Sequence, residues 1–249
     1  LNVLTRWIHH PNFQIAHSTP AWFIPVVGNI LVPIAGVEHG FYEVSWFFFS
    51  IGIIYWLVLK TLIFNRVIFH DPLPEKLLPT LFILIAPPAV GFISYMKLNN
   101  EVLDGFARIL FYTGAFLVLL LFTQFLRFSR IKFFMSWWAY SFPLAAFTIA
   151  SQIMYLRTGS GLFSMLSYIM LAIVTGVVSI LLFRTARAII SGHVFQPYVL
   201  REVGGKLIAI IGQAFPYTPI ANPSRFMPDW TFGIRAGELQ ELIQEIKST

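Results

Sequence analysis

The sequence has no cysteine and few charged residues. None of its 249 residues is Cys, and only 11% are Asp, Glu, Lys or Arg. The first absence excludes disulfides, catalytic thiolates and cysteine metal sites. The second is far below the figure of about 25% that is typical of soluble domains. Together with 57% hydrophobic residues and a mean hydropathy of +0.74, it predicts a membrane protein.

Acidic residues are also missing from the long apolar runs. Between residues 44 and 183 they are confined to expected loops, at Asp71, Glu75, Glu101 and Asp104. Proton-coupled carriers usually keep a carboxylate inside the membrane, and cation pathways usually have acidic rings. Their absence argues against both mechanisms.

Six apolar runs are close to the length of about 20 residues that spans a bilayer. They cover residues 20–37, 44–64, 77–96, 109–126, 133–156 and 162–183. We therefore predict an all-α membrane protein with six transmembrane helices arranged as three hairpins. The transmembrane domain would occupy residues 20–190, between an N-terminal loop (1–19) and a partial soluble tail (191–249).

The fifth run, FFMSWWAYSFPLAAFTIASQIMYL, is uncharged over 24 residues. Proline at position 143 predicts a kink at its centre. After the kink come small or hydroxylated residues, which allow neighbouring helices to approach closely. The run is typical of a pore-lining or tightly packed inner helix.

Interior prolines occur in the first, third and fifth runs and are absent from the other three. We expect these odd helices to line a central axis, because a kinked backbone is tolerated only where protein or water satisfies it. The alternative is that prolines are simply common in membrane helices. The candidate pore-lining and kink residues are Pro25, Gly28, Asn29, Pro33, Pro87, Pro88, Ser141 and Pro143.

Basic residues predict the orientation. Nine lie on the side of the chain start and three on the other side. By the positive-inside rule the first side is cytoplasmic, so both ends of the six-span unit would face the cytoplasm. The first set is Arg6, Lys60, Arg66, Lys76, Arg127, Arg130, Lys132, Arg184 and Arg187, and the second is Lys97, Arg108 and Arg157. Because the basic residues flank apolar runs rather than forming one polar face, the net charge of +6 reflects membrane topology, and we expect no nucleic-acid partner.

Three histidines near the chain start, His9, His10 and His17, could bind a metal ion. No carboxylate accompanies them, so an interfacial loop is favoured over a metal site. We expect neither a metal nor a cofactor.

The remaining chemistry suits an anion. Aromatic, small and hydroxyl groups would line the pathway, and Lys and Arg would stand at its mouths. Phe142, directly before the proline kink, could occlude a narrow pore. The alternatives are that Phe142 is one of 26 Phe that simply face lipid or other helices, and that the bundle has no pathway.

The sequence of the tail (191–249) is typical of a soluble segment. Residues 206–212 (KLIAIIG) predict a buried strand, a proline-rich loop follows, and apolar residues at 239, 242, 243 and 246 predict an amphipathic helix. These elements are too few to bury a core of their own.

The segments TPAWFIPVVGNILVP, the Pro87 and Pro88 pair, WWAYSFPLAAFTIAS and SGHVF resemble the tellurite-resistance/dicarboxylate transporter family over residues 15–197. That family includes bacterial TehA and the slow anion channels of plant guard cells. The resemblance implies ten helices, as five hairpins around a pore, of which the six runs match the last six. It also implies that Phe142 corresponds to the occluding phenylalanine of the ninth helix.

The same resemblance implies function and setting. A small anion would cross the cell inner membrane: a C4-dicarboxylate, sulfite, tellurite or a halide. A proton-coupled exporter is the alternative to a channel. Members of the family form trimers, so a homotrimer within the lipid bilayer is the implied assembly.

Residues 199–247, including EVGGKLIAIIGQAFPYTPIANPSRFMPDWTFGI, resemble part of the bacterial thiosulfohydrolase of sulfur oxidation, a relative of dimetal 5'-nucleotidases. The metal-binding motifs of such enzymes are absent, and no histidine follows His193. We therefore expect no hydrolase activity; an enzyme of that class would carry bound manganese. Two joined reading frames, or a genuine fusion that would point to a sulfur oxyanion, could explain the tail.

Overall fold

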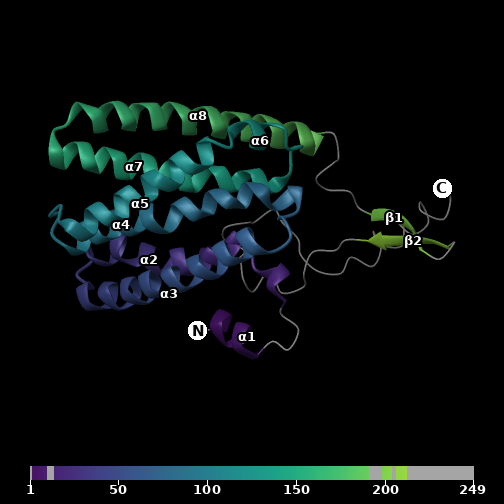
Figure 1. Cartoon of the computed structure of the whole chain (residues 1–249), viewed down its shortest axis with the longest axis horizontal. Coiled ribbons are helices and arrows are strands. Elements are labelled where there is room, and N and C mark those ends of the chain that lie inside the picture. The colour runs from purple at the N-terminus through teal and green to yellow at the C-terminus, as the bar shows by residue number, and fades with distance from the viewer. Residues whose placement is uncertain (1, 10–13, 191–197, 204–205, 212–249) are drawn as a thin grey trace, which may run out of the picture. The chain divides into compact units, whose positions relative to one another are not determined.

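The computed structural model describes residues 2–9, 14–190, 198–203 and 206–211. The chain forms two compact units, Leu1–Arg184 and Thr185–Thr249. All the regular secondary structure described in the first unit is helical, and its long helices run side by side (Figure 1).

The described residues of the helical unit form α-helices and 3₁₀ helices, which are labelled η. In chain order these elements are α1 (Asn2–His9), η1 (Ile15–His17), η2 (Pro20–Trp22), α2 (Phe23–Gly36), α3 (Tyr42–Phe69), η3 (Glu75–Ile85), α4 (Ala86–Leu98), α5 (Gly105–Phe122), α6 (Phe125–Ser129), η4 (Met135–Tyr140), α7 (Ser141–Thr158) and α8 (Gly161–Ile190). A helical segment thus overlaps each of the six predicted runs.

Four helical segments of the described chain are long and apolar enough to cross a membrane. They are Tyr42–Phe69, Glu75–Leu98, Gly105–Phe122 and Gly161–Ile190, and Pro20–Gly36 is a shorter apolar helix. Protein buries 83% of the most apolar stretch of Glu75–Leu98. The corresponding values for α3, α5 and α8 are 33%, 39% and 22%. The third predicted run is therefore central, and the even runs are peripheral.

The three proline-containing runs share a local structure that the peripheral helices lack. In each, a 3₁₀ helix passes directly into an α-helix whose third residue is proline: Pro25 in α2, Pro88 in α4 and Pro143 in α7. Proline has no N–H and cannot donate to the carbonyl four residues before it. The preceding backbone is instead satisfied by the tighter i→i+3 bonds of the 3₁₀ helix.

Two of the predicted spans differ in detail from the structure. Residues 133–156 were expected to form one helix kinked at Pro143, whereas η4 changes to α7 at Ser141, two residues earlier. The predicted fourth span, 109–126, is shifted: α5 covers Gly105–Phe122 because Asp104 caps its N-terminus, and the short α6 follows after a turn.

The N-terminal loop prediction was wrong for residues 2–9, which form α1. Leu4, Trp7 and Ile8 follow helical spacing and make an apolar stripe. The ring of Trp7 stacks on Trp22 of η2 with 4.5 Å between ring centroids, so α1 is attached to the start of the first predicted span.

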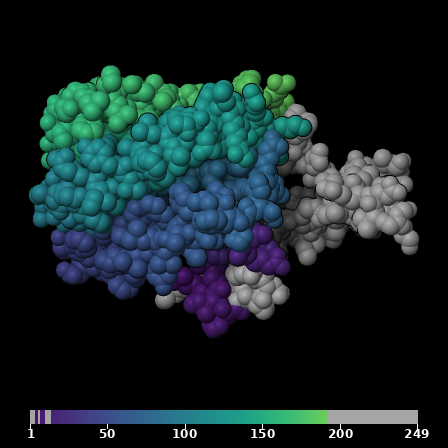
Figure 2. Space-filling view, in the orientation of Figure 1, coloured from purple at the N-terminus to yellow at the C-terminus, as the bar shows by residue number. Residues whose placement is uncertain are grey.

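Large apolar side chains form the core, notably Phe23, Phe92, Phe111 and Phe147. Phe111 of α5 lies parallel to Phe147 of α7, with 5.4 Å between ring centroids. Helices α2 and α3 pack closely at Gly52, where an added Cβ would lie 2.5 Å from Cγ1 of Ile30. The space-filling view shows the chain's segments forming adjacent bands in chain order (Figure 2).

In the second unit, β1 (Tyr198–Val203) pairs antiparallel with β2 (Lys206–Ile211). Strand β2 coincides with the predicted apolar strand, while β1 was not expected. The predicted C-terminal helix lies outside the described residues.

Candidate functional site

The elements predicted to line a pathway form a row in which α4 contacts α2 on one side and α7 on the other (Figure 1). Helices α3 and α5 pack against this row from outside. We call η2–α2, η3–α4 and η4–α7 the inner elements, and α3, α5 and α8 the outer helices.

The structure divides the predicted lining residues into three groups by exposure. Pro33, Pro87, Pro88 and Pro143 are buried, Pro25, Asn29 and Ser141 are half-buried, and Gly28 and Phe142 are exposed. The set therefore lies on three adjacent helices but not on one surface. All residues from 86 to 94 of α4 are buried, so the α4 prolines face protein.

Helix α7 has one uncovered stripe that includes Phe142. The side chain of Phe142 is 47% exposed. Ile149, Gln152 and Leu156 are exposed at positions seven, ten and fourteen residues further on, which is the spacing of one helix face. Phe142 thus begins an open stripe of an inner helix.

Helix α2 has a comparable open stripe. Ile24, Gly28 and Ala35 are exposed at helical spacing. A Cβ added to Gly28 would meet no atom within 4 Å. Each flanking inner helix therefore presents one uncovered face, and α4 between them presents none.

Hydroxyl groups on the inner helices bond backbone carbonyls rather than facing a pathway as free donors. Thr148 and Ser151 each donate to the carbonyl four residues earlier, at 2.8 Å. Ser141 donates to the carbonyl of Trp138, also at 2.8 Å. Such local bonds are the usual alternative for Ser and Thr in helices. The prediction that hydroxyl groups line the pathway stays a prediction, and in this structure these three hydroxyls bond carbonyls of their own segment.

Ser94 makes a bond of a different kind. Its hydroxyl, buried in α4, donates to the carbonyl of Ile30 in α2 at 2.6 Å. Helix α2 has two other special features nearby. Pro33 has no backbone N–H, and the side-chain amide of Asn29 donates to the carbonyl of Pro25 at 2.8 Å. The link between α4 and α2 is thus a hydrogen bond inside the apolar core.

A chain of ion pairs joins the inner helices at one end. Nζ of Lys97, at the end of α4, lies 2.9 Å from Glu38 after α2 and 4.0 Å from Glu101. Glu101 also pairs with Arg157 at the end of α7. Glu101 has a φ of 63°, in the left-handed region. The hydrogen bond and charge of Lys97 lower the pKa of Glu38.

The same end carries a second polar cluster, around Asp104. The backbone N–H of Ala107 donates to its carboxylate at 2.9 Å, and the hydroxyl of Tyr95 donates at 2.6 Å. The Ala107 bond first, and then the Tyr95 bond, lower the pKa of Asp104. Asp104 thereby caps α5 and ties it to α4.

The opposite end is rich in basic side chains. In the part of the chain that the structure describes, ion pairs between side chains involve only Lys97 and Arg157, and so none is at this end. Arg66 is only 4% exposed and donates to the carbonyl of Asp71, while its Nε has no partner among the described residues. The two ends of the helical unit therefore differ strongly in charge.

Among the described residues, no group of three or more His, Cys, Asp or Glu side chains could hold a metal ion. His10 lies outside the described residues.

Apolar membrane-length helices, an inner row whose α2, α4 and α7 contain no Asp or Glu, and one strongly basic end are features of a membrane channel or transporter. Residues 1–186 match the family model described as voltage-dependent anion channel (SLAC1). The chain belongs to this family, which agrees with the resemblance to the plant slow anion channels. Members of the family are channels or transporters and not enzymes.

Curated relatives include plant and archaeal proteins. The chain is 26% identical to the S-type anion channel SLAH3 of Arabidopsis thaliana over 211 residues, covering 84% of this chain and 32% of SLAH3. It is 32% identical to SLAH2 of the same plant over 134 residues, covering 54% of this chain and 26% of SLAH2. An uncharacterized transporter of Methanocaldococcus jannaschii, MJ0576, is 24% identical, covering 74% of this chain and 59% of the archaeal protein. The chain thus spans between about a quarter and three fifths of these relatives' lengths.

The ion pairs and the cavity beside η4 were not predicted from the sequence. Glu101 was predicted only as a loop residue, because its pairing depends on which helix ends meet. Arg184 was predicted only as a basic residue on the cytoplasmic side, and no local pattern marks the cavity because helices far apart in the sequence line it.

Proposed function

We propose that the chain contributes part of a pathway that carries small anions across the membrane. The observation that supports this best is the charge distribution. The α-helices of the inner row contain no acidic residue, and the basic residues at one end have no ion-pair partners among the described residues. Anions are attracted to such an end, whereas cations gain nothing from it.

The candidate substrates come from the resemblance to the tellurite-resistance/dicarboxylate transporter family. They are C4-dicarboxylate, sulfite, tellurite and halide ions. Because the inner hydroxyls already bond carbonyls, an anion would lose water without gaining strong donors. We therefore expect a weakly binding pathway in which anions with the lowest cost of dehydration pass fastest.

The pathway would need more helices than these. The chain spans only part of its relatives, and the uncovered stripes of α2 and α7 are surfaces that further inner helices would close. We propose six membrane crossings, with kinks where the 3₁₀ helices meet α-helices. The basic end, and with it both ends of the six-span unit, would lie on the cytoplasmic side of the inner membrane. A homotrimer remains part of this proposal.

Phe142 is the proposed gate. It lies on the open stripe of α7, in the first turn after the change from η4, where a bulky ring would face the space enclosed by the inner helices. An aromatic ring at a narrow point closes a pore by filling it and by excluding water.

Ion flux in vesicles containing the complete channel tests the proposal. We expect anion currents that reverse at the anion equilibrium potential and that do not depend on a pH gradient. A flux that follows the pH gradient would instead favour a proton-coupled exporter. Currents carried by cations would contradict the proposed anion pathway.

A further inference from the structure

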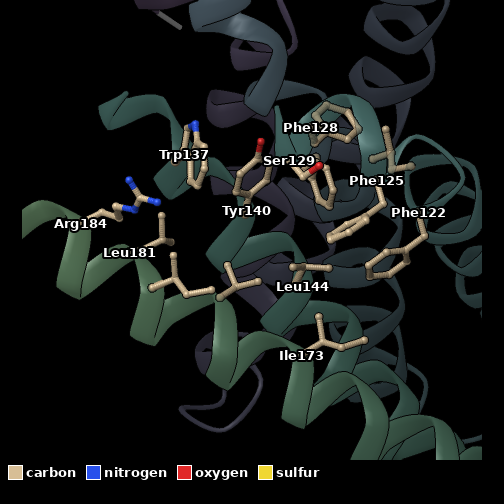
Figure 3. A pocket seen from close by; sticks show the side chains of 14 residues that line it. Phe122, Phe125, Phe128, Ser129, Trp137, Tyr140, Leu144, Ile173, Leu181 and Arg184 are labelled. Atoms are coloured by element: carbon tan, nitrogen blue, oxygen red, sulfur yellow. The ribbon is translucent and has the colours of Figure 1, made fainter. Parts of the chain in front are cut away.

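A cavity of about 330 Å³ is lined by α5, α6 and α8 and by residues of the inner elements η3, η4 and α7 (Figure 3). Its lining is almost entirely apolar, with Phe122, Leu144 and Ile173 among the walls. Phe142 does not line it. The proposed gate residue is therefore not part of the cavity.

The cavity is amphipathic from one side to the other. In Figure 3 the polar atoms of Trp137, Tyr140 and Arg184 gather on one side, whereas Ile173 and Leu144 lie on the other. Ile173 and Arg184 are eleven residues apart on α8, so the cavity extends on the order of 16 Å along that helix. This is about half of a 30 Å hydrocarbon core, the depth of one bilayer leaflet.

The polar side of the cavity has unused binding capacity. Tyr140 is 9% exposed, and its hydroxyl has no hydrogen-bond partner among the described residues. The exposed Arg184 forms no ion pair within the described chain. Arg127 and Arg130 lie on and directly after α6, but they line a different pocket together with Glu75. Arg184 is therefore the basic residue in the lining of this cavity.

We propose that this cavity binds an anionic phospholipid. One acyl chain fills the apolar side, and the phosphate lies beside Arg184 at the membrane surface. The match of cavity depth to one leaflet favours a lipid over a small soluble anion. The guanidinium group of Arg184, which forms no ion pair within the described chain, favours an anionic headgroup over a neutral one, since basic pockets between transmembrane helices recognise such headgroups. The binding does not depend on Phe142 acting as a gate.

Lipid retention by the purified chain tests the proposal. The chain would be exchanged into nanodiscs of equimolar phosphatidylglycerol and phosphatidylcholine, extracted into mild detergent, and analysed by native mass spectrometry. We expect the chain to retain phosphatidylglycerol in preference to phosphatidylcholine. Equal retention of both lipids, or retention of neither, would overturn the proposal.

Two variants separate the headgroup from the acyl chain. Arg184→Gln should lower phosphatidylglycerol retention about fivefold, the effect of one basic residue near a charged lipid surface. Its matched control is Arg187→Gln, one turn further along α8 and outside the lining, which should retain the lipid like the wild type. If the two variants behave alike, Arg184 does not hold the headgroup and the site is wrong.

Val177→Trp places a large side chain in the cavity and should abolish retention of the lipid. Leu182→Trp makes the same change at an exposed position of α8 that does not line the cavity, and should have no effect. Circular dichroism would show whether each variant folds. Because Arg184 is exposed, the Arg184→Gln result decides the proposal even if Val177→Trp does not fold.

Discussion

The inner elements and the outer helices are both rich in apolar residues but differ in backbone and burial. Each outer helix is one uninterrupted α-helix with much of its surface uncovered by protein. Each inner element is a 3₁₀ helix followed by an α-helix with proline in its first turn. A backbone with altered hydrogen bonding thus occurs where neighbouring protein surrounds it, most completely at η3–α4.

This difference shows that hydropathy alone does not tell which helices lie inside the bundle. Apolarity places a helix in the membrane, while proline and small residues decide which helix lies inside the bundle. The η3 helix extends over eleven residues, although 3₁₀ helices rarely exceed three or four. Pro79 within it, and Pro87 and Pro88 just after it, remove the N–H groups that an α-helix would need there.

The largest expected effect on stability comes from the same substitution made on an inner and on an outer helix. Phe147 of α7 is 1% exposed, so Phe147→Ala should lower the free energy of unfolding by about 3–5 kcal/mol through the cavity it leaves. Phe116 of α5 is 61% exposed, and Phe116→Ala should change it by less than about 0.5 kcal/mol. Unfolding in mixed micelles measures both values, and equal losses would remove the distinction.

A pair of glycines sharpens the comparison at the contact between α2 and α3. Gly52→Ala should cost about 1–3 kcal/mol, because its Cβ would press on Ile30. Gly28→Ala adds a methyl group to open space and should stabilise α2 by about 0.5–1 kcal/mol. The same unfolding assay distinguishes the opposite signs. A destabilised Gly28→Ala protein would mean that the α2 stripe is covered.

Hydrogen bonds should show a smaller contrast. Ser94→Ala removes the buried bond from α4 to the Ile30 carbonyl and should cost about 1 kcal/mol. Thr61→Ala removes an exposed local bond on outer helix α3 and should cost less. Similar values for the two variants would show that the Ser94 bond adds nothing to the packing of α4 on α2.

The smallest expected effect is on the stability of the protein at acidic pH. The pKa of Asp104 is lower in the folded protein than its usual value, so its contribution is complete above that usual value and is lost as pH falls through the folded pKa. Because Asp104 is near the surface, this contribution should be below about 1 kcal/mol. Asp104→Asn should remove that part of the acid dependence. Parallel pH profiles for the two proteins would argue against it.

The sequence predicted much of this arrangement because proline and apolar length act locally. The positions of the helices and the special status of the proline-containing runs could be inferred from Pro25, Pro88 and Pro143. The 3₁₀ helices could not, since hydropathy does not distinguish i→i+3 from i→i+4 bonding. Helix α1 was missed although the spacing of Leu4 and Trp7 was visible.

The candidate site was less predictable. Hydropathy and residue type indicate that Thr148 and Ser151 lie on an inner helix, but they do not show that each hydroxyl bonds the carbonyl one turn earlier. The pairing of Glu101 with both Lys97 and Arg157 depends on three helix ends meeting, which no local pattern encodes.

The central claim is that the inner row conducts anions past Phe142. The most direct test is the single-channel anion conductance of the complete channel with Phe142→Ala, compared with the wild type and with Phe116→Ala on the outer α5. We predict a severalfold higher conductance for Phe142→Ala and wild-type conductance for Phe116→Ala. Unchanged conductance in the Phe142→Ala channel would contradict the proposed gate and its place on the pathway.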